Sequence, residues 1–168
     1  MNPGLVDRLR LTKERIAGMA EGIRQIVKLP DPVGEILDDY EAENGLHIVK
    51  KRVPMGVIGI IYESRPNVTA DAFGLCFKSG SAVILKGGSD AIRSNMAITK
   101  VIQDAVVRRG VDPYVIQLIE STDRSVVNEF MKMKQYVDLL IPRGGAGLIR
   151  NVVENLSLIH ISEPTRHL

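Results

Sequence analysis

The most regular pattern of apolar and polar positions in the chain lies in residues 56–89. An almost wholly apolar run, Val57–Tyr62, is followed by a polar break and then by residues 68–78, where apolar positions have helical spacing. A second apolar run, Ala82–Leu85, follows a glycine. Short apolar runs of this kind are typical of strands buried on both faces of a parallel sheet. The segment therefore predicts a strand–helix–strand unit, whose crossover is right-handed in nearly all known proteins.

Apolar runs and helical patterns continue to alternate after this unit. We expect strands at 115–119 and 137–141, and helices at 90–109, 124–133 and 148–153. This alternation predicts the α/β class, with a mostly parallel, Rossmann-like sheet and flanking helices.

Two segments before the central unit follow other patterns. Residues 5–29 carry apolar side chains three or four positions apart with charged residues between them, which predicts one amphipathic helix. Residues 33–54 are predicted to be extended chain around Asn44-Gly45, and Asn-Gly between apolar runs is a strong hairpin signal. We expect this hairpin to project from the main sheet and to pair with another subunit.

Composition narrows the class of protein. The 168 residues are 45% hydrophobic and suffice for one domain with a buried core, while a net charge of +2 gives no argument for nucleic-acid binding. No apolar run approaches the roughly 18 residues of a membrane helix, and the N-terminus lacks a signal-peptide layout. A single cysteine excludes a disulfide framework and, without histidine clusters, a thiolate zinc site. We expect a cytoplasmic protein without metal, nucleic acid or membrane.

Three polar loops follow predicted strands, at the edge of the sheet where α/β proteins bind ligands. Their glycines allow close approach of the backbone, and the helix amino termini that follow favour anions, so a phosphate-bearing ligand fits. Glycine pairs in such loops are also often plain turn chemistry. Neither a GxGxxG fingerprint after the first strand nor a GxxxxGK[ST] P-loop occurs. The loops are Glu63-Ser64-Arg65-Pro66-Asn67, Lys86-Gly87-Gly88-Ser89 and Pro142-Arg143-Gly144-Gly145.

Cys76, the only cysteine, is a tempting nucleophile with an unsuitable setting. It lies between two large apolar residues in a predicted helix, where a free cysteine usually acts as a small buried hydrophobe. Tyr62 and Glu63 could serve as an acid and a base, but nothing in the sequence pairs them.

Four stretches carry long and specific motifs: LVDRLRLTKERIAGMAEGIRQI, LPDPVGEIL, GVIGIIYESRPNVTADAFGLCFKSGSAVILKGGSDA and VDLLIPRGGAGLIRNVVEN. Together they closely resemble the γ-glutamyl phosphate reductase (glutamate-5-semialdehyde dehydrogenase) family of the aldehyde dehydrogenase superfamily. The resemblance implies reduction of L-glutamyl 5-phosphate to L-glutamate 5-semialdehyde and phosphate by NADPH, in proline biosynthesis from glutamate. It also implies an NADP-binding domain of aldehyde dehydrogenase type over residues 1–155, with part of an oligomerisation hairpin at about 33–54.

The resemblance assigns roles to the loops. Lys86 matches the lysine that reaches the adenosine ribose, and Ser89 would leave room for a 2′-phosphate, which favours NADPH, whereas the neighbouring Asp90 opposes it. Gly144 and Gly145 match glycines under the pyrophosphate and nicotinamide. The implied cofactor-binding set is Glu63, Ser64, Lys86, Gly87, Gly88, Ser89, Pro142, Arg143, Gly144 and Gly145.

Arg65 and Asn67 are the implied substrate-binding residues. Asn67 is the candidate oxyanion donor, because an Asn amide in this loop can help to hold a carbonyl oxygen. Arg65 would meet the acyl phosphate or a cofactor phosphate, and a structural salt bridge is an equal alternative.

The chain also departs from the family. Members attack the acyl phosphate with a cysteine thiolate in a catalytic domain that follows the PRGGAGLIR stretch and that we expect to be absent here, whereas Cys76 matches a cofactor-domain helix. Residues 156–168 match no family element, so we predict a non-native tail outside the fold. We therefore expect an inactive fragment of the enzyme.

A stand-alone nucleotide- or phosphate-binding module without catalysis is the alternative hypothesis. A third hypothesis is that the segment belongs to a bifunctional protein fused to a glutamate kinase. The full-length protein is expected to be a homo-oligomer, with glutamate 5-kinase as a candidate partner.

Overall fold

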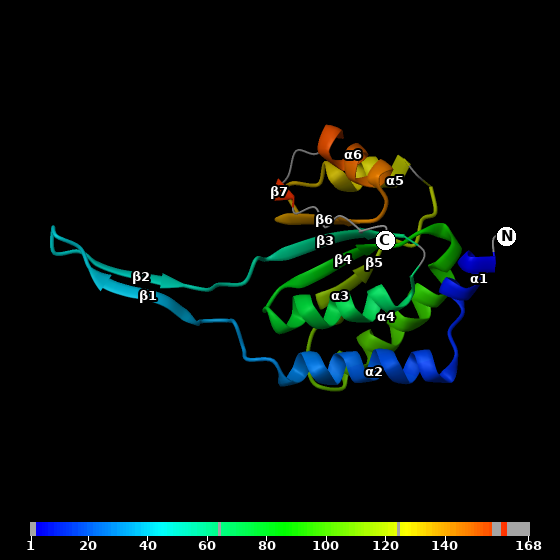
Figure 1. Cartoon of the computed structure of the whole chain (residues 1–168), viewed down its shortest axis with the longest axis horizontal. Coiled ribbons are helices and arrows are strands. Elements are labelled where there is room, and N and C mark those ends of the chain that lie inside the picture. The colour runs from blue at the N-terminus through cyan, green and yellow to red at the C-terminus, as the bar shows by residue number, and fades with distance from the viewer. Residues whose placement is uncertain (1–2, 64, 124, 156–158, 161–168) are drawn as a thin grey trace.

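A computed structural model describes residues 3–63, 65–123, 125–155 and 159–160. Its main body is a five-stranded parallel sheet with helices on both faces, and a two-stranded ribbon extends from one end (Figure 1). The predicted α/β class, parallel sheet and hairpin are confirmed. The strand order is β5 (Ile116–Leu118), β4 (Ala82–Lys86), β3 (Val57–Tyr62), β6 (Leu139–Arg143) and β7 (Ile159–His160).

Helices cover the two faces of the sheet in pairs. On one face lie α3 (Asn67–Lys78) and α4 (Ile92–Val107), and on the other lie α5 (Ser125–Met131) and α6 (Ala146–Asn155) (Figure 1). Short 3-10 turns, η1 (Ser89–Ala91) and η2 (Pro113–Val115), precede α4 and β5.

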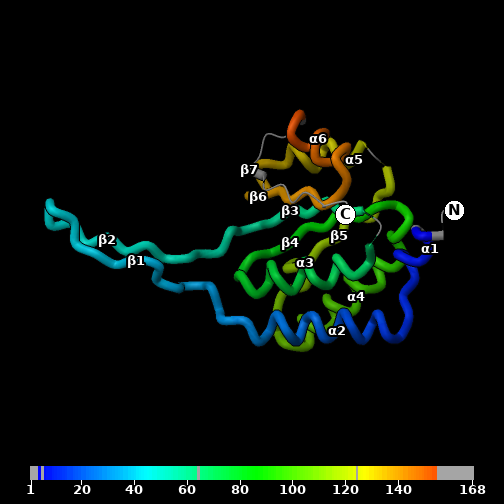
Figure 2. Tube along the Cα trace, in the orientation of Figure 1, coloured from blue at the N-terminus to red at the C-terminus, as the bar shows by residue number. Residues whose placement is uncertain are grey.

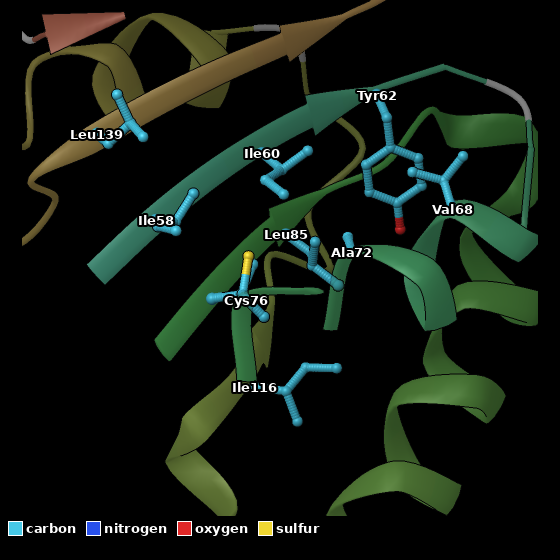
Figure 3. Close-up of a cluster of buried hydrophobic side chains, with 10 residues drawn as sticks. Ile58, Ile60, Tyr62, Val68, Ala72, Cys76, Leu85, Ile116 and Leu139 are labelled. Carbon is cyan, nitrogen blue, oxygen red and sulfur yellow. The ribbon is translucent and has the colours of Figure 1, made fainter. Parts of the chain in front are cut away.

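The central strand β3 carries apolar side chains on both faces because successive residues of a strand point to opposite sides. Ile58, Ile60 and Tyr62 belong to the core under α3 and α4, and Ile61 belongs to the core under α5 and α6. Figure 3 shows the first of these clusters. Its other buried members are Val68, Ala72, Cys76, Val83, Leu85, Ile116 and Leu139.

The single helix predicted over residues 5–29 is wrong, because the chain forms α1 (Pro3–Leu9) and α2 (Lys13–Lys28) instead. Thr12 is extended between them, and its hydroxyl accepts the backbone N–H of Arg15 at 3.3 Å. The Arg15 guanidinium reaches back to the Asp7 carboxylate at 2.9 Å and donates to the carbonyl of Arg10 at 3.0 Å. One side chain therefore caps the end of α1 while Thr12 caps the start of α2.

The apolar side of α2 packs on α3 and not directly on the sheet. A Cβ placed on Gly74 of α3 would lie 2.8 Å from Cδ1 of Ile23 and 2.9 Å from Cδ1 of Ile26. The absence of a side chain at Gly74 thus allows the two helices to approach closely.

The predicted hairpin consists of β1 (Ile36–Glu41) and β2 (His47–Lys51), which pair antiparallel. Gly45 in its turn has φ +80°, a left-handed conformation that favours glycine. Every residue of both strands is exposed, and the ribbon projects beyond the sheet (Figure 2). Pairing of this ribbon with another subunit stays a prediction.

Two predicted boundaries at the C-terminal end change. The strand expected at 137–141 runs from Leu139 to Arg143, and the Asp138 carboxylate just before it accepts the N–H of Val57 at 2.8 Å. Ile159–His160 forms β7 and pairs with β6, so the expectation that 156–168 lies wholly outside the fold is wrong for these two residues. The predicted non-native origin of that segment stays a prediction.

Gly59 and Gly18 provide a matched pair of stability variants. A Cβ on Gly59 would lie 2.8 Å from side-chain atoms of Leu140 and Phe130, whereas one on Gly18 meets nothing within 4 Å. We expect Gly59→Ala to lower the free energy of unfolding by about 1–3 kcal/mol through overpacking. Gly18→Ala should raise it by about 0.5–1 kcal/mol because alanine favours the helix. Urea unfolding followed by circular dichroism measures both, and equal effects of the two variants would contradict this packing.

Candidate functional site

The carboxyl ends of β3, β4 and β6 lie side by side because β3 pairs with both of its neighbours. Ile61 is opposite Lys86 on one edge and Pro142 on the other, and Tyr62 is opposite Arg143. The three predicted loops therefore leave the sheet next to one another. Pro142 and Arg143 are the last residues of β6, so only the two glycines of the third loop lie outside the strand.

The strand order reverses between β3 and β6. The chain runs outward from β3 through β4 to β5, and then returns to the opposite side of β3 to form β6. Crevices at such reversals, outside the carboxyl ends of the strands, are where open α/β sheets bind ligands. The first and third loops flank this reversal, and the Lys86 loop adjoins them.

Lys86 is a buried cation at the end of β4. The residue is 5% exposed, and its ammonium group donates to the carbonyl oxygen of Gly87 at 3.1 Å. Burial lowers the pKa of Lys86, because the charged form loses hydration. No carboxylate forms an ion pair with it among the described residues. An ammonium group has three donors, so this residue retains capacity for a polar or anionic ligand.

A buried polar network lies beneath the Lys86 loop. The Tyr62 hydroxyl and the Thr69 hydroxyl are 2.7 Å apart, and Thr69 donates to Oδ1 of Asn95 at 3.2 Å. Burial raises the pKa of Tyr62 to about 12, although its bond with Thr69 acts in the opposite direction. Nδ2 of Asn95 has no hydrogen-bond partner in the described part of the chain, and a Cβ on Gly87 would lie 2.3 Å from it.

This network was missed by the sequence analysis. Thr69 and Asn95 are both fully buried, and each stands on the inward side of a predicted helix. Polar residues at inward positions were the available signal, because buried polar groups almost always have partners.

Glu63 joins the first loop to the third. Its carboxylate accepts the backbone N–H of Gly145 at 3.2 Å, immediately before α6. A Cβ on Gly144 would lie 2.9 Å from the same carboxylate oxygen, so the backbone and the acid are in close contact. Glu63 therefore already contacts the amino terminus of a helix, where a negative charge is favoured.

The remaining predicted cofactor residues lie on the second loop or outside the described residues. Gly87 is buried, Gly88 is partly buried, and Ser89 and Asp90 are exposed at the start of η1. Ser64 lies outside the described residues.

The predicted substrate residues line a cavity together with residues of α1 and α2. Asn67 is the first residue of α3, and its amide donates to the carboxylate of Asp71 at 3.3 Å. The Arg65 guanidinium forms no hydrogen bond or ion pair with any described residue, so the salt bridge considered for it is not formed there. The role of Asn67 as an oxyanion donor stays a prediction.

Cys76 lies in the core and not at this edge. It is 5% exposed, among the side chains shown in Figure 3, and burial raises its pKa to about 11. The predicted burial is confirmed, and both access and ionisation argue against a nucleophilic role. Within the described ranges, no group of three or more His, Cys, Asp or Glu residues could hold a metal ion. No helix in those ranges is long and apolar enough to cross a membrane.

Comparison with proteins of similar sequence shows which enzyme the chain is related to. Gamma-glutamyl phosphate reductase of Lachnospira eligens is 61% identical over 155 residues, and that of Agathobacter rectalis is 59% identical over 154 residues. Each match covers 92% of this chain and 37% of the relative. The chain is homologous to one segment of gamma-glutamyl phosphate reductase. It spans just over a third of the length of these curated relatives. No protein-family model matches the chain.

Solved structures agree with this relationship. The crystal structure of gamma-glutamyl phosphate reductase from Thermotoga maritima matches with a TM-score of 0.91 and 45% identity, over 95% of this chain and 39% of that one. An engineered glycolyl-CoA reductase with bound NADP+ matches with a TM-score of 0.68 and 16% identity, over 94% of this chain and 39% of that one. At 16% identity, the second match shows only that this chain shares its fold with that enzyme.

The thiol of Cys76 should react slowly in the folded chain. With a pKa of about 11, only about one thiol in a thousand is ionised at pH 8. We expect a thiol-exchange reagent such as Ellman's reagent to modify it at least about a hundred times more slowly in buffer than in denaturant.

Ionisation of Cys76 should make the folding stability of the chain fall at high pH. Because folding raises this pKa, the stability contributed by the neutral thiol is complete below about pH 8.5 and is lost as pH rises through about 11. The denatured chain is the internal control for reagent and pH. Equal modification rates in buffer and in denaturant would contradict the buried position of Cys76.

Proposed function

We propose that the chain is the cofactor-binding part of an NADPH-dependent gamma-glutamyl phosphate reductase. The whole enzyme would reduce L-glutamyl 5-phosphate to L-glutamate 5-semialdehyde and release phosphate, in proline biosynthesis from glutamate. The observation that carries the proposal is the meeting of the Lys86 loop, the Glu63 loop and Gly144-Gly145 at the reversal of strand order. The sequence identity to named reductases supports the substrate, and the NADP+-bound fold neighbour supports the cofactor class.

The residues at this edge fit a dinucleotide phosphate. Two backbone positions, Gly87 and Gly144, have no room for a Cβ, as expected where the chain lies close to other groups. Lys86 supplies a buried positive charge, and the unpartnered Asn95 amide lies directly beneath its loop.

Each group has a proposed part in binding. Lys86 would hold the adenosine ribose and its 2′-phosphate, with Gly87, Gly88 and Ser89 around it. Pro142, Arg143, Gly144 and Gly145 would lie against the pyrophosphate and nicotinamide. The cofactor supplies the hydride, and the protein supplies orientation and charge. Glu63 would keep the first and third loops in register, and Ser64 completes the proposed set.

The chain alone is proposed to be catalytically inactive. The reductase mechanism requires an accessible thiolate, and the only cysteine in this sequence is buried in the core. Asn67 and Arg65 would contact the substrate, but the nucleophile would have to come from another part of the enzyme.

Assembly and location complete the proposal. The exposed β1–β2 ribbon would pair with another subunit, making the whole enzyme a cytoplasmic homo-oligomer, and glutamate 5-kinase is a candidate partner because it would supply the acyl phosphate. A nucleotide-binding module without catalysis remains the alternative function.

Loss of the Lys86 charge should weaken NADP+ binding. Lys86→Met keeps much of the side-chain volume and removes only the ammonium group. We expect a dissociation constant about 10–100 times higher by titration calorimetry, the effect of losing one charged contact. Lys28→Met, at the exposed end of α2, is the control. A folded wild-type chain that does not bind NADP+ would refute the proposed cofactor site.

Ser89 should determine the preference for NADP+ over NAD+. Ser89→Glu places a carboxylate beside the proposed 2′-phosphate position, so NADP+ affinity should fall about tenfold while NAD+ affinity changes less than about twofold. Gln25→Glu adds the same charge on α2, away from the site. Equal weakening of both cofactors by Ser89→Glu would contradict this assignment.

A further inference from the structure

A cavity outside the proposed cofactor edge gathers charged residues from distant parts of the chain. It lies between the α1–α2 connection and the start of α3 and has a volume of about 390 Å³. Cavities that hold small ligands have volumes of about 300–1,000 Å³, so this one is large enough for a single small molecule. Its charged lining residues are Asp7, Arg8, Arg10, Arg15, Arg65 and Asp71.

The positive charges of the cavity are not neutralised within the described chain. Arg15 is committed to the ends of the helices, because it pairs with Asp7 at 2.9 Å. The guanidinium groups of Arg8, Arg10 and Arg65 form no hydrogen bond or ion pair with described residues. Guanidinium groups bind carboxylates and phosphates through paired donors, so three unused ones favour an anionic ligand.

The cavity also contains a carboxylate with unused acceptor capacity. Asp71 is partly buried on α3 and accepts one hydrogen bond, from the amide of Asn67 at 3.3 Å. A carboxylate can accept about four hydrogen bonds, so Asp71 could also receive an ammonium group. A ligand with both anionic and ammonium groups matches this lining better than a simple anion does.

We propose that Arg8, Arg10 and Asp71 are specificity-determining residues of a substrate site in this cavity. Arg8 and Arg10, together with Arg65, contact the anionic groups of the substrate, and Asp71 contacts its ammonium group. The inference rests on the proposed function, since L-glutamyl 5-phosphate carries both kinds of group. It adds two residues of the N-terminal segment, Arg8 and Arg10, and Asp71 of α3 to the substrate site.

The position of the cavity suits this role. Arg65 stands two residues after Glu63, whose carboxylate is bonded to Gly145 at the proposed cofactor edge. A ligand bound to Arg65 would therefore lie at the same loop that contacts the proposed cofactor site through Glu63. Substrate recognition would then depend on α1 and on its connection to α2.

The test uses a stable probe and the chain of 168 residues. In L-2-amino-6-phosphonohexanoate, two methylene groups replace the carbonyl carbon and the bridging oxygen of the acyl phosphate. Its binding is followed by NMR of the ¹⁵N-labelled chain, including the arginine side-chain signals. We expect Arg8→Gln and Arg10→Gln each to weaken binding about three- to tenfold, because each removes one partly solvated charged contact. Arg109→Gln, an exposed arginine after α4, is the control for net charge.

A second comparison tests the ammonium contact. The ligand 6-phosphonohexanoate lacks only the amino group, so Asp71→Asn should weaken the amino acid probe and leave this analogue almost unchanged. Circular dichroism verifies that each variant is folded. Failure of the wild-type chain to bind the probe, or equal binding by Arg8→Gln, Arg10→Gln and wild type, would overturn the proposal. NADP+ titration of the same samples reports separately on the proposed cofactor function.

Discussion

The pairing of β3 with a neighbour on each edge is the constraint on which the rest of this structure depends. Because β3 is enclosed on both edges and both faces, its residues must be apolar throughout, and its polar continuation can emerge only at the carboxyl end. The same pairing fixes the ends of β4 and β6 beside it. Residues more than fifty positions apart, such as Lys86 and Gly144, are thereby brought to one edge.

Two polar groups at this edge are buried, and burial costs free energy when a polar group has no hydrogen-bond partner. Lys86 is nearly buried with a single carbonyl acceptor, and Asn95 has a donor without a partner among described residues. Buried groups of this kind cost free energy unless a ligand or water satisfies them. The tyrosine–threonine–asparagine network below the loop joins β3 to α3 and α4 by hydrogen bonds.

The sequence allowed the parallel sheet, the hairpin and the three loops to be predicted, since each has a local pattern. The apolar run of β3 and the Asn44-Gly45 turn are clear in single stretches of a few residues. The break at Thr12 was missed because helical apolar spacing continues across it, and the decisive contact joins Arg15 to Asp7 in three dimensions. The cavity joining Arg8 to Arg65 could not be predicted, because its walls come from segments more than fifty residues apart.

The base of the β1–β2 ribbon is clamped against the main body. Gly80, in the turn between α3 and β4, leaves just enough room for Val33, which precedes β1, and for Pro54, which follows β2. A Cβ there would lie 2.9 Å from Pro54 and 3.2 Å from Val33. Both ends of the ribbon are therefore packed against the same turn of the main body. Because β2 ends at Lys51 and β3 begins at Val57, a change in the direction of the ribbon would reach the central strand through a connection of only a few residues.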